Sequence, residues 1–231
     1  MAVRFVRRGR DIAWGLAGLG LFIACALVAN RGTVGVTEQH IFRAINGLPD
    51  TLTPAMDKAQ ILGVLAVGPI AALFALALRR WRLAAAFAIV TVAKLLTERL
   101  VWQVVQRDRP GTTEPVVHVR GSTPSSGISF VSGHVMLVSG LAWSLTPYLR
   151  GRWKLAPWAV VVLVAFARVY LGAHNPIDVL GGFALGITIG AAANLAVGAP
   201  ELEEGATEEA GAKRAAGAPP RPPDTYPVVP A

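Results

Sequence analysis

The chain has 231 residues, of which 53% are hydrophobic and only 16% are charged, so it is too apolar for an ordinary soluble domain. The formal net charge of +8 is compatible with binding to nucleic acid. However, the arginines and lysines lie at the ends of apolar segments, as the residues that determine topology do in membrane proteins. The single cysteine, Cys25, excludes an intrachain disulfide and a cysteine-rich metal site. We therefore expect a membrane protein with no nucleic-acid partner.

The first predicted membrane span is an apolar run over residues 12–30. It follows the basic residues 1–11 and is long enough to cross a bilayer. A signal peptide is the alternative interpretation. The run is long for one, and no clear small-residue cleavage site closes it, so the sequence favours a retained helix.

The next segment, residues 31–58, is polar enough to lie outside the hydrocarbon. Ile41, Phe42 and Ile45 recur in it at helical spacing, which predicts an amphipathic interfacial helix; a connecting loop is the alternative. The second predicted span then covers residues 61–78 and ends in a cluster of arginines.

Four further apolar segments complete an all-α bundle of six transmembrane helices. They are predicted over residues 83–105, 130–149, 155–171 and 176–197. The last span carries many small residues, which suit close helix packing in a membrane. The membrane domain is thus expected over residues 12–198, and the acidic, proline-rich residues 199–231 are predicted to form a disordered tail.

Two oppositely charged residues lie inside the third predicted span. Lys94 and Glu98 are four positions apart and share a helix face, so they can neutralise each other in the bundle. The sequence leaves a structural and a functional role for this pair equally open.

The distribution of basic residues predicts the topology. Six spans with a cytoplasmic N-terminus place the basic stretches at residues 4–10, 79–82 and 150–154 in the cytoplasm, as the positive-inside rule requires. Both termini are then cytoplasmic, and the chain is a multi-pass protein of the plasma (inner) membrane. Three polar regions, residues 107–109, 132–134 and 168–178, then come together on the extracytoplasmic side.

The junction between the last two spans carries the strongest signal of chemistry. Asn175 and Pro176 predict a helix N-cap followed by proline at the first helical position, with Asp178 in the first turn and His174 just outside it. The carboxylate can then orient the imidazole, while Arg168 and the helix N-terminus favour a bound anion. The alternative is a polar helix junction in which the histidine has only a structural role, with its hydrogen bonds made within the protein.

Three motifs in order resemble those of the type-2 phosphatidic acid phosphatase (PAP2) superfamily, which are Lys-x6-Arg-Pro, Pro-Ser-Gly-His and Ser-Arg-x5-His-x3-Asp. The matching residues are Arg109-Pro110 for the first motif, Ser132-Gly133-His134 for the second, and Arg168, His174 and Asp178 for the third. The resemblance covers about residues 35–197. It departs from the family pattern at Trp102, Val131 and Ala167, which replace Lys, Pro and Ser.

The resemblance implies a role for each of these residues. His174 would attack phosphorus to give a phosphohistidine, Asp178 would orient it, and His134 would protonate the leaving group. The phosphate would be held by Arg109, Arg168, Ser132 and Gly133. No metal and no other cofactor is expected, because the cations take the electrostatic part of a metal.

Trp102 removes one cation from the expected phosphate site. Arg107, next to Arg109 beyond the predicted helix end, is the favoured replacement, and Arg99 on the same helix is the other candidate. The alternative for Arg107 is a role at the membrane interface.

The predicted function is hydrolysis of a lipid phosphate monoester or an isoprenoid pyrophosphate at the extracytoplasmic face, with outward topology tilting toward the pyrophosphate. A lipid phosphotransferase would use the same site, and a non-catalytic membrane protein or lipid carrier is the alternative from another class. The expected partners are the lipid substrate and the membrane, and the sequence assigns no oligomeric state.

Overall fold

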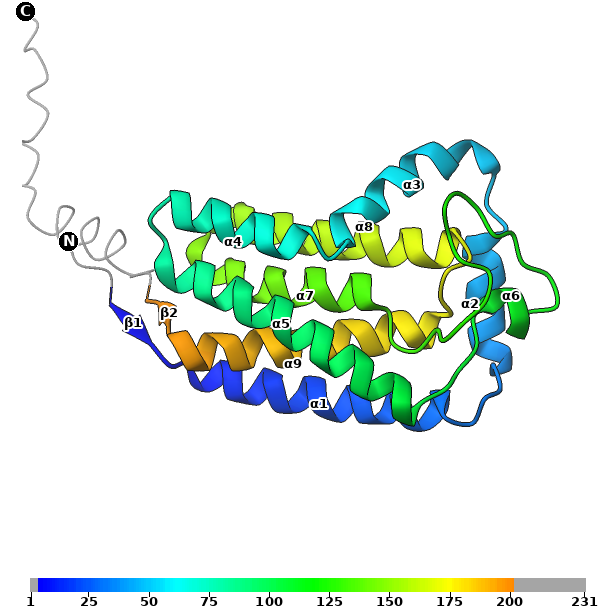
Figure 1. Cartoon of the computed structure of the whole chain (residues 1–231), viewed down its shortest axis with the longest axis horizontal. Helices are drawn as coiled ribbons and strands as arrows, with labels where there is room; N and C mark the ends of the chain where they lie inside the picture. Colours follow the sequence, from blue (N-terminus) through cyan, green and yellow to red (C-terminus); the bar gives the residue numbers. More distant parts are fainter. Residues whose placement is uncertain (1–3, 202–231) are drawn as a thin grey trace, which may run out of the picture. The chain divides into compact units, whose positions relative to one another are not determined.

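A computed structural model describes residues 4–201, which form a mostly helical bundle with one very short strand pair (Figure 1). The bundle helices are α1 (Gly9–Ala29), α4 (Val67–Ala77), α5 (Trp81–Val104), α7 (Gly133–Leu145), α8 (Ala156–Tyr170) and α9 (Pro176–Val197). Shorter helices are α2 (Val36–Asn46), α3 (Thr53–Gln60) and α6 (Pro110–Thr113), with 3-10 turns η1 (Asp50–Leu52), η2 (Ile61–Gly63), η3 (Thr146–Tyr148) and η4 (Gly151–Leu155). The strands are β1 (Phe5–Val6) and β2 (Ala199–Pro200).

Three helical segments within the described residues are long and apolar enough to cross a membrane: α1, η4 with α8, and α9. A fourth span results if the segments Asp50–Gly63 and Val67–Ala77 act as one, although they meet at an angle of 62°. The expected count of six is therefore not confirmed. The predicted third span does exist as α5, but its charged residues place it outside this apolar class, and α7 has only 13 residues.

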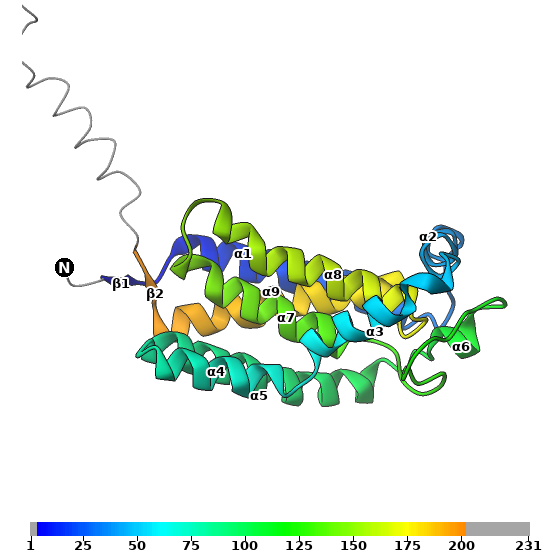
Figure 2. The same ribbon diagram turned by 90° about the horizontal axis from the view of Figure 1, so that it is seen from above.

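Helix α9 lies at the centre of the bundle, against α1, α5 and α7 (Figures 1 and 2). Its glycines allow this contact, as the sequence predicted. A Cβ atom at Gly190 would lie 2.8 Å from the carbonyl oxygen of Gly140 on α7, and one at Gly182 would lie 2.5 Å from that of Ser132. Because real Cβ atoms do not approach so closely, glycine at these positions allows α7 to pack directly against α9, at its start and at its middle.

The ends of the described chain meet at one end of the bundle. Strand β1 pairs antiparallel with β2, with Phe5 opposite Pro200 and Val6 opposite Ala199. The predicted tail therefore begins with two residues of a strand pair, and its remainder from residue 202 lies outside the described residues.

The opposite end of the bundle carries most of the irregular chain (Figure 1). It consists of α2, the long connection between α5 and α7, and the junction between α8 and α9. Of the two interpretations of residues 31–58, the helical one is confirmed over α2, whose Phe42 is fully buried while Ile41 is 47% exposed. This end gathers the residues that the sequence singled out.

Candidate active site

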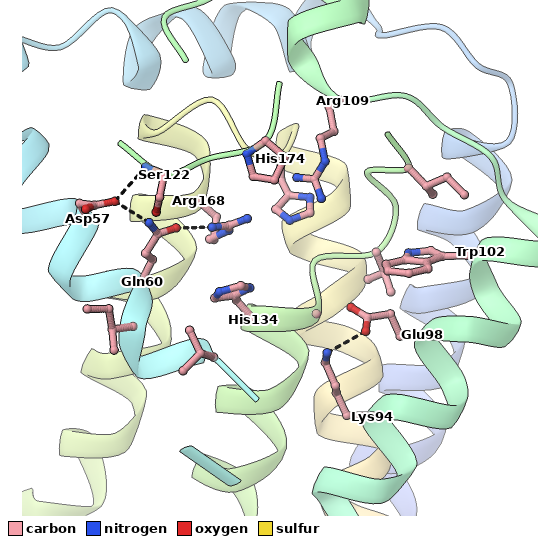
Figure 3. Close-up of a pocket in the computed structure, with 16 residues that line it drawn as sticks. Asp57, Gln60, Lys94, Glu98, Trp102, Arg109, Ser122, His134, Arg168 and His174 are labelled. Carbon is pink, nitrogen blue, oxygen red and sulfur yellow. Dashed lines mark hydrogen bonds and ion pairs between the residues drawn. The ribbon is translucent and has the colours of Figure 1, made fainter. Parts of the chain in front are cut away.

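A cavity of about 370 Å³ opens at this end of the bundle, where α7 begins (Figure 3). Its polar lining combines two histidines and several charged side chains from α3, α5, the α5–α7 connection, α7 and the α8–α9 region. These residues are Asp57, Gln60, Lys94, Glu98, Arg109, His134, Arg168 and His174. The predicted polar regions thus converge on one cavity, although they are distant in sequence.

The α8–α9 junction has the predicted local structure. Asn175 is the N-cap residue of α9 and Pro176 occupies its first turn. The carboxylate of Asp178 reaches back to the helix start, where its Oδ2 accepts a hydrogen bond from the Asn175 backbone N–H at 2.8 Å. Asp178 is fully buried, and His174 is 4% exposed.

Ser129 stands between His174 and Asp178, where the sequence predicted a direct contact. Its hydroxyl donates to Asp178 Oδ2 at 2.5 Å and lies 3.3 Å from His174 Nδ1. Since the Ser129 hydroxyl donates its hydrogen bond to the carboxylate, its oxygen can accept a hydrogen bond from Nδ1–H of His174. This tautomer leaves Nε2 as the unprotonated nitrogen. Sequence reasoning missed Ser129 because it lies in a loop whose path no local pattern indicates.

Arg107 lies behind Asp178 rather than in the cavity. Its guanidinium contacts Glu38 of α2 at 2.7 and 3.1 Å and Asp178 at 3.1 Å, and its side chain is fully buried. This corrects the expected position beside the phosphate, because both carboxylates occupy the guanidinium. Glu38 also accepts the backbone N–H of Ile177 at 3.0 Å, so α2 supports the start of α9. The sequence offered only a lone acidic residue in an amphipathic helix as a signal for Glu38.

The remaining predicted phosphate ligands lie around the two histidines. Arg109 and Arg168 line the cavity, where Arg109 donates to the Ala173 carbonyl at 2.9 Å and Arg168 donates to Gln60 (Figure 3). Gly133 also lines the cavity. Its chain neighbour Ser132 does not, and the buried Ser132 hydroxyl has no hydrogen-bond partner within residues 4–201.

The electrostatic environment keeps His174 neutral. Burial lowers its pKa well below the ordinary value of an imidazole, and the positive charges of Arg168 and Arg109 lower the pKa further. A neutral imidazole between two guanidinium groups is suited to act on an anion that those groups bind.

Helix α5 contributes Lys94, Glu98 and Trp102 to the same cavity. Lys94 Nζ donates to Glu98 Oε2 at 2.7 Å, which confirms that the two charges pair. Neither Arg107 nor Arg99 lines the cavity, so among the described residues of α5 only Lys94 brings a cation to it.

No group of three or more His, Cys, Asp or Glu side chains within residues 4–201 is arranged to hold a metal ion. Independence from metals stays a prediction, to be checked by activity in a chelator.

Comparisons with known proteins agree on one family. The family model of the PAP2 superfamily matches residues 81–200. A decaprenylphosphoryl-5-phosphoribose phosphatase of Mycobacterium tuberculosis is 37% identical over 115 residues, which are 49% of this chain and 59% of that protein. Phosphatidylglycerophosphatase B of Bacillus subtilis is 36% identical over 107 residues, 40% of this chain and 49% of that protein. The chain thus spans about half of the length of these curated relatives.

Two crystal structures share the fold. They are LpxE of Aquifex aeolicus and a transmembrane PAP2-type phosphatidylglycerolphosphate phosphatase of Bacillus subtilis, each with a TM-score of 0.58 and 23% identity. The match covers 67% of this chain and 92% of the former, and 77% of this chain and 94% of the latter.

The buried contact between Glu38 and Arg107 predicts a stability effect. Glu38→Ala leaves part of a buried guanidinium unpaired, so we expect the free energy of unfolding to fall by as much as about 3 kcal/mol. Thermal unfolding of the purified protein in detergent measures the change. His40→Ala, at an exposed position of the same helix, is the control. Equal stability of the two variants would contradict the assigned role of Glu38.

Proposed function

Because the chain belongs to the PAP2 superfamily, whose family model matches residues 81–200, we propose that it is a membrane phosphatase that hydrolyses lipid phosphates. The observation that carries the proposal is the pair of histidines, His134 and His174, on one cavity that also receives Arg109 and Arg168. A neutral nucleophile, a second titratable group and two fixed cations are the parts that phosphoryl transfer requires.

In the first step, His174 Nε2 attacks the phosphorus atom. The new N–P bond forms as the bond from phosphorus to the leaving oxygen breaks, which gives a phosphohistidine. Ser129 and Asp178 hold the Nδ1 side of the ring and stabilise the positive charge that develops on it. His134 donates a proton to the leaving oxygen, so that the departing alcohol or phosphate is neutralised.

The phosphoryl oxygens need donors throughout this step. Arg109 and Arg168 supply charged ones, and the backbone N–H of Gly133 and the hydroxyl of Ser132 supply neutral ones. The position of Ser132 directly before Gly133, which lines the cavity, supports this role, and its buried hydroxyl has no partner among the described residues. In the second step, water attacks the phosphohistidine and His134 accepts its proton, which releases phosphate and restores His174.

The substrate is proposed to be a lipid phosphate monoester or an isoprenoid pyrophosphate. An apolar groove of about 360 Å³ between α4, α5, α7 and α8 could hold a lipid tail, which favours a lipid substrate. Leu62 lines this groove and its chain neighbour Ile61 lines the cavity, so both spaces are bordered by the η2 turn. The relatives named above act on an isoprenoid-linked phosphoribose and on phosphatidylglycerophosphate, so both tails occur among similar proteins.

The orientation proposed for the site is extracytoplasmic, with six membrane crossings and both termini in the cytoplasm. The α4–α5 turn and the η4 turn carry basic residues and lie at the bundle end opposite the cavity, which supports this orientation by the positive-inside rule (Figure 1).

The two histidines are expected to respond differently to substitution. His174→Ala removes the nucleophile and should abolish phosphate release from every substrate. His134→Ala should keep most of its activity on p-nitrophenyl phosphate, whose leaving group needs no proton, and lose it on an alkyl phosphate. Phosphate release by purified protein in EDTA measures both. Equal loss on p-nitrophenyl phosphate would contradict the assigned roles.

Ser129 is expected to act through His174. Ser129→Ala removes the hydroxyl that links the imidazole to Asp178, so kcat should fall about tenfold or more, as roughly 1.4 kcal/mol of lost stabilisation implies. Ser125→Ala, at an exposed position of the same connection, is the matched control. A Ser129→Ala protein that forms phosphohistidine at the original rate would remove Ser129 from the mechanism.

The orientation can be tested by cysteine labelling in intact cells. Val116 and Trp153 are both 64% exposed and lie at opposite ends of the bundle, and Cys25→Ala removes the background thiol. We expect an impermeant maleimide to modify Val116→Cys and not Trp153→Cys. The reverse labelling pattern would place the site on the cytoplasmic side.

A further inference from the structure

The cavity is larger than a phosphoryl group and divides into two chemically different parts. Its volume is about 370 Å³. One part, formed by Arg109, Arg168 and the two histidines, offers mainly donors and positive charge. The other part is formed by α5, and the proposed phosphoryl transfer uses none of its residues.

Three side chains of α5 make up this second part. Lys94, Glu98 and Trp102 are spaced four residues apart, so they form one stripe along the helix, and all three line the cavity (Figure 3). We call them the α5 stripe. Lys94 Cε and Glu98 also approach Gly133, where a Cβ atom would lie only 2.9 Å from Lys94 Cε. The stripe therefore borders the phosphate end of the cavity directly.

The α5 stripe has hydrogen-bonding groups that no residue within the described part of the chain uses. The indole Nε1–H of Trp102 is buried and has no partner among the described residues. Glu98 receives Lys94 on Oε2, and its Oε1 accepts no hydrogen bond from any residue within 4–201. Because Trp102 and Glu98 line the same cavity from one helix, this donor and this acceptor together suit a ligand that both accepts and donates hydrogen bonds.

Hydroxyl groups meet this requirement, and a second phosphate does not. A hydroxyl donates to a carboxylate and accepts from an indole N–H or an ammonium, whereas a phosphate next to Glu98 adds like charge in a partly buried place. The indole also presents a large apolar face, which can cover the carbon skeleton of a sugar or a polyol.

We propose that the α5 stripe is a headgroup subsite that binds the hydroxyls of a sugar or polyol whose phosphate monoester is cleaved. This inference rests on the proposed phosphatase function and narrows it to hydroxyl-bearing headgroups, in preference to isoprenoid pyrophosphates. The tryptophan at position 102 then serves recognition of the headgroup in place of a phosphate-binding lysine.

The test uses two pairs of phosphate esters that differ only in hydroxyls. Glycerol 3-phosphate is paired with propyl phosphate, and ribose 5-phosphate with tetrahydrofurfuryl phosphate, with p-nitrophenyl phosphate as the reference substrate. The full-length protein should favour the hydroxylated member by about tenfold or more in kcat/KM in at least one pair. The glycerol pair reports a polyol headgroup, and the ribose pair reports a sugar.

Substitution of the stripe should remove this preference. Glu98→Gln keeps the shape of the side chain but replaces one accepting oxygen by a donating NH2 group and removes the negative charge. Trp102→Phe removes the indole N–H but keeps an aromatic ring. Each should bring the kcat/KM ratio of the favoured pair toward one, whereas Gln103→Leu, an exposed neighbour on α5 outside the cavity, should keep the ratio of the unmodified protein.

Two results would overturn the subsite: a ratio near one in both pairs for the unmodified protein, or a preference that survives both stripe substitutions. Absence of phosphate release from all five substrates and also from phosphatidic acid, a lipid phosphate monoester, would instead contradict the phosphatase function itself.

Discussion

The buried charge of Arg107 is the constraint on which the rest of the active-site end depends. A guanidinium removed from water is very unfavourable unless carboxylates pair with it, and here Glu38 and Asp178 both do. The same contacts tie α2 to the start of α9 and fix the carboxylate of Asp178. Asp178 then holds Ser129, and Ser129 holds the imidazole of His174. The orientation of the proposed nucleophile is thus set by a charge that never reaches the cavity.

Close packing supplies the second half of the geometry. The start of α7 lies against α9 because Gly182 has no side chain and so leaves room for the carbonyl of Ser132. Any larger residue at position 182 would collide with that carbonyl. His134 follows directly on α7, so its position relative to His174 depends on two helix starts that touch through backbone atoms. A side chain at Gly182 would separate the proposed acid from the proposed nucleophile without touching either.

The features that the sequence could predict are those set by interactions between residues close together in the chain. Apolar length and capping residues are local signals, and they predicted α1, α5, α8 and α9 closely, with the N-cap at Asn175. The 62° break before α4 and the shortness of α7 depend on tertiary packing. Local sequence signals therefore could not predict the number of membrane-spanning helices. The site divides similarly. Local motifs led to His134, His174, Arg109 and Arg168, but Ser129, Glu38 and the position of Arg107 follow from the path of a loop and from one contact between distant segments.

The departure at Trp102 acquires a physical meaning when the two parts of the cavity are considered together. Arg107 is paired with two carboxylates, so Arg109 and Arg168 are the cations left at the proposed phosphate end of the cavity. A lysine at position 102 would lie one helical turn after Glu98 and would compete with Lys94 for the Glu98 carboxylate. That competition would weaken the contact of the lysine with a phosphate. An uncharged donor at this position avoids that competition and leaves one oxygen of Glu98 free. The loss of a lysine at position 102 is therefore compatible with the presence of Glu98 in the same cavity. In our proposal, both features make the α5 side of the cavity suitable for neutral hydroxyls, while Arg109 and Arg168 bind the phosphate.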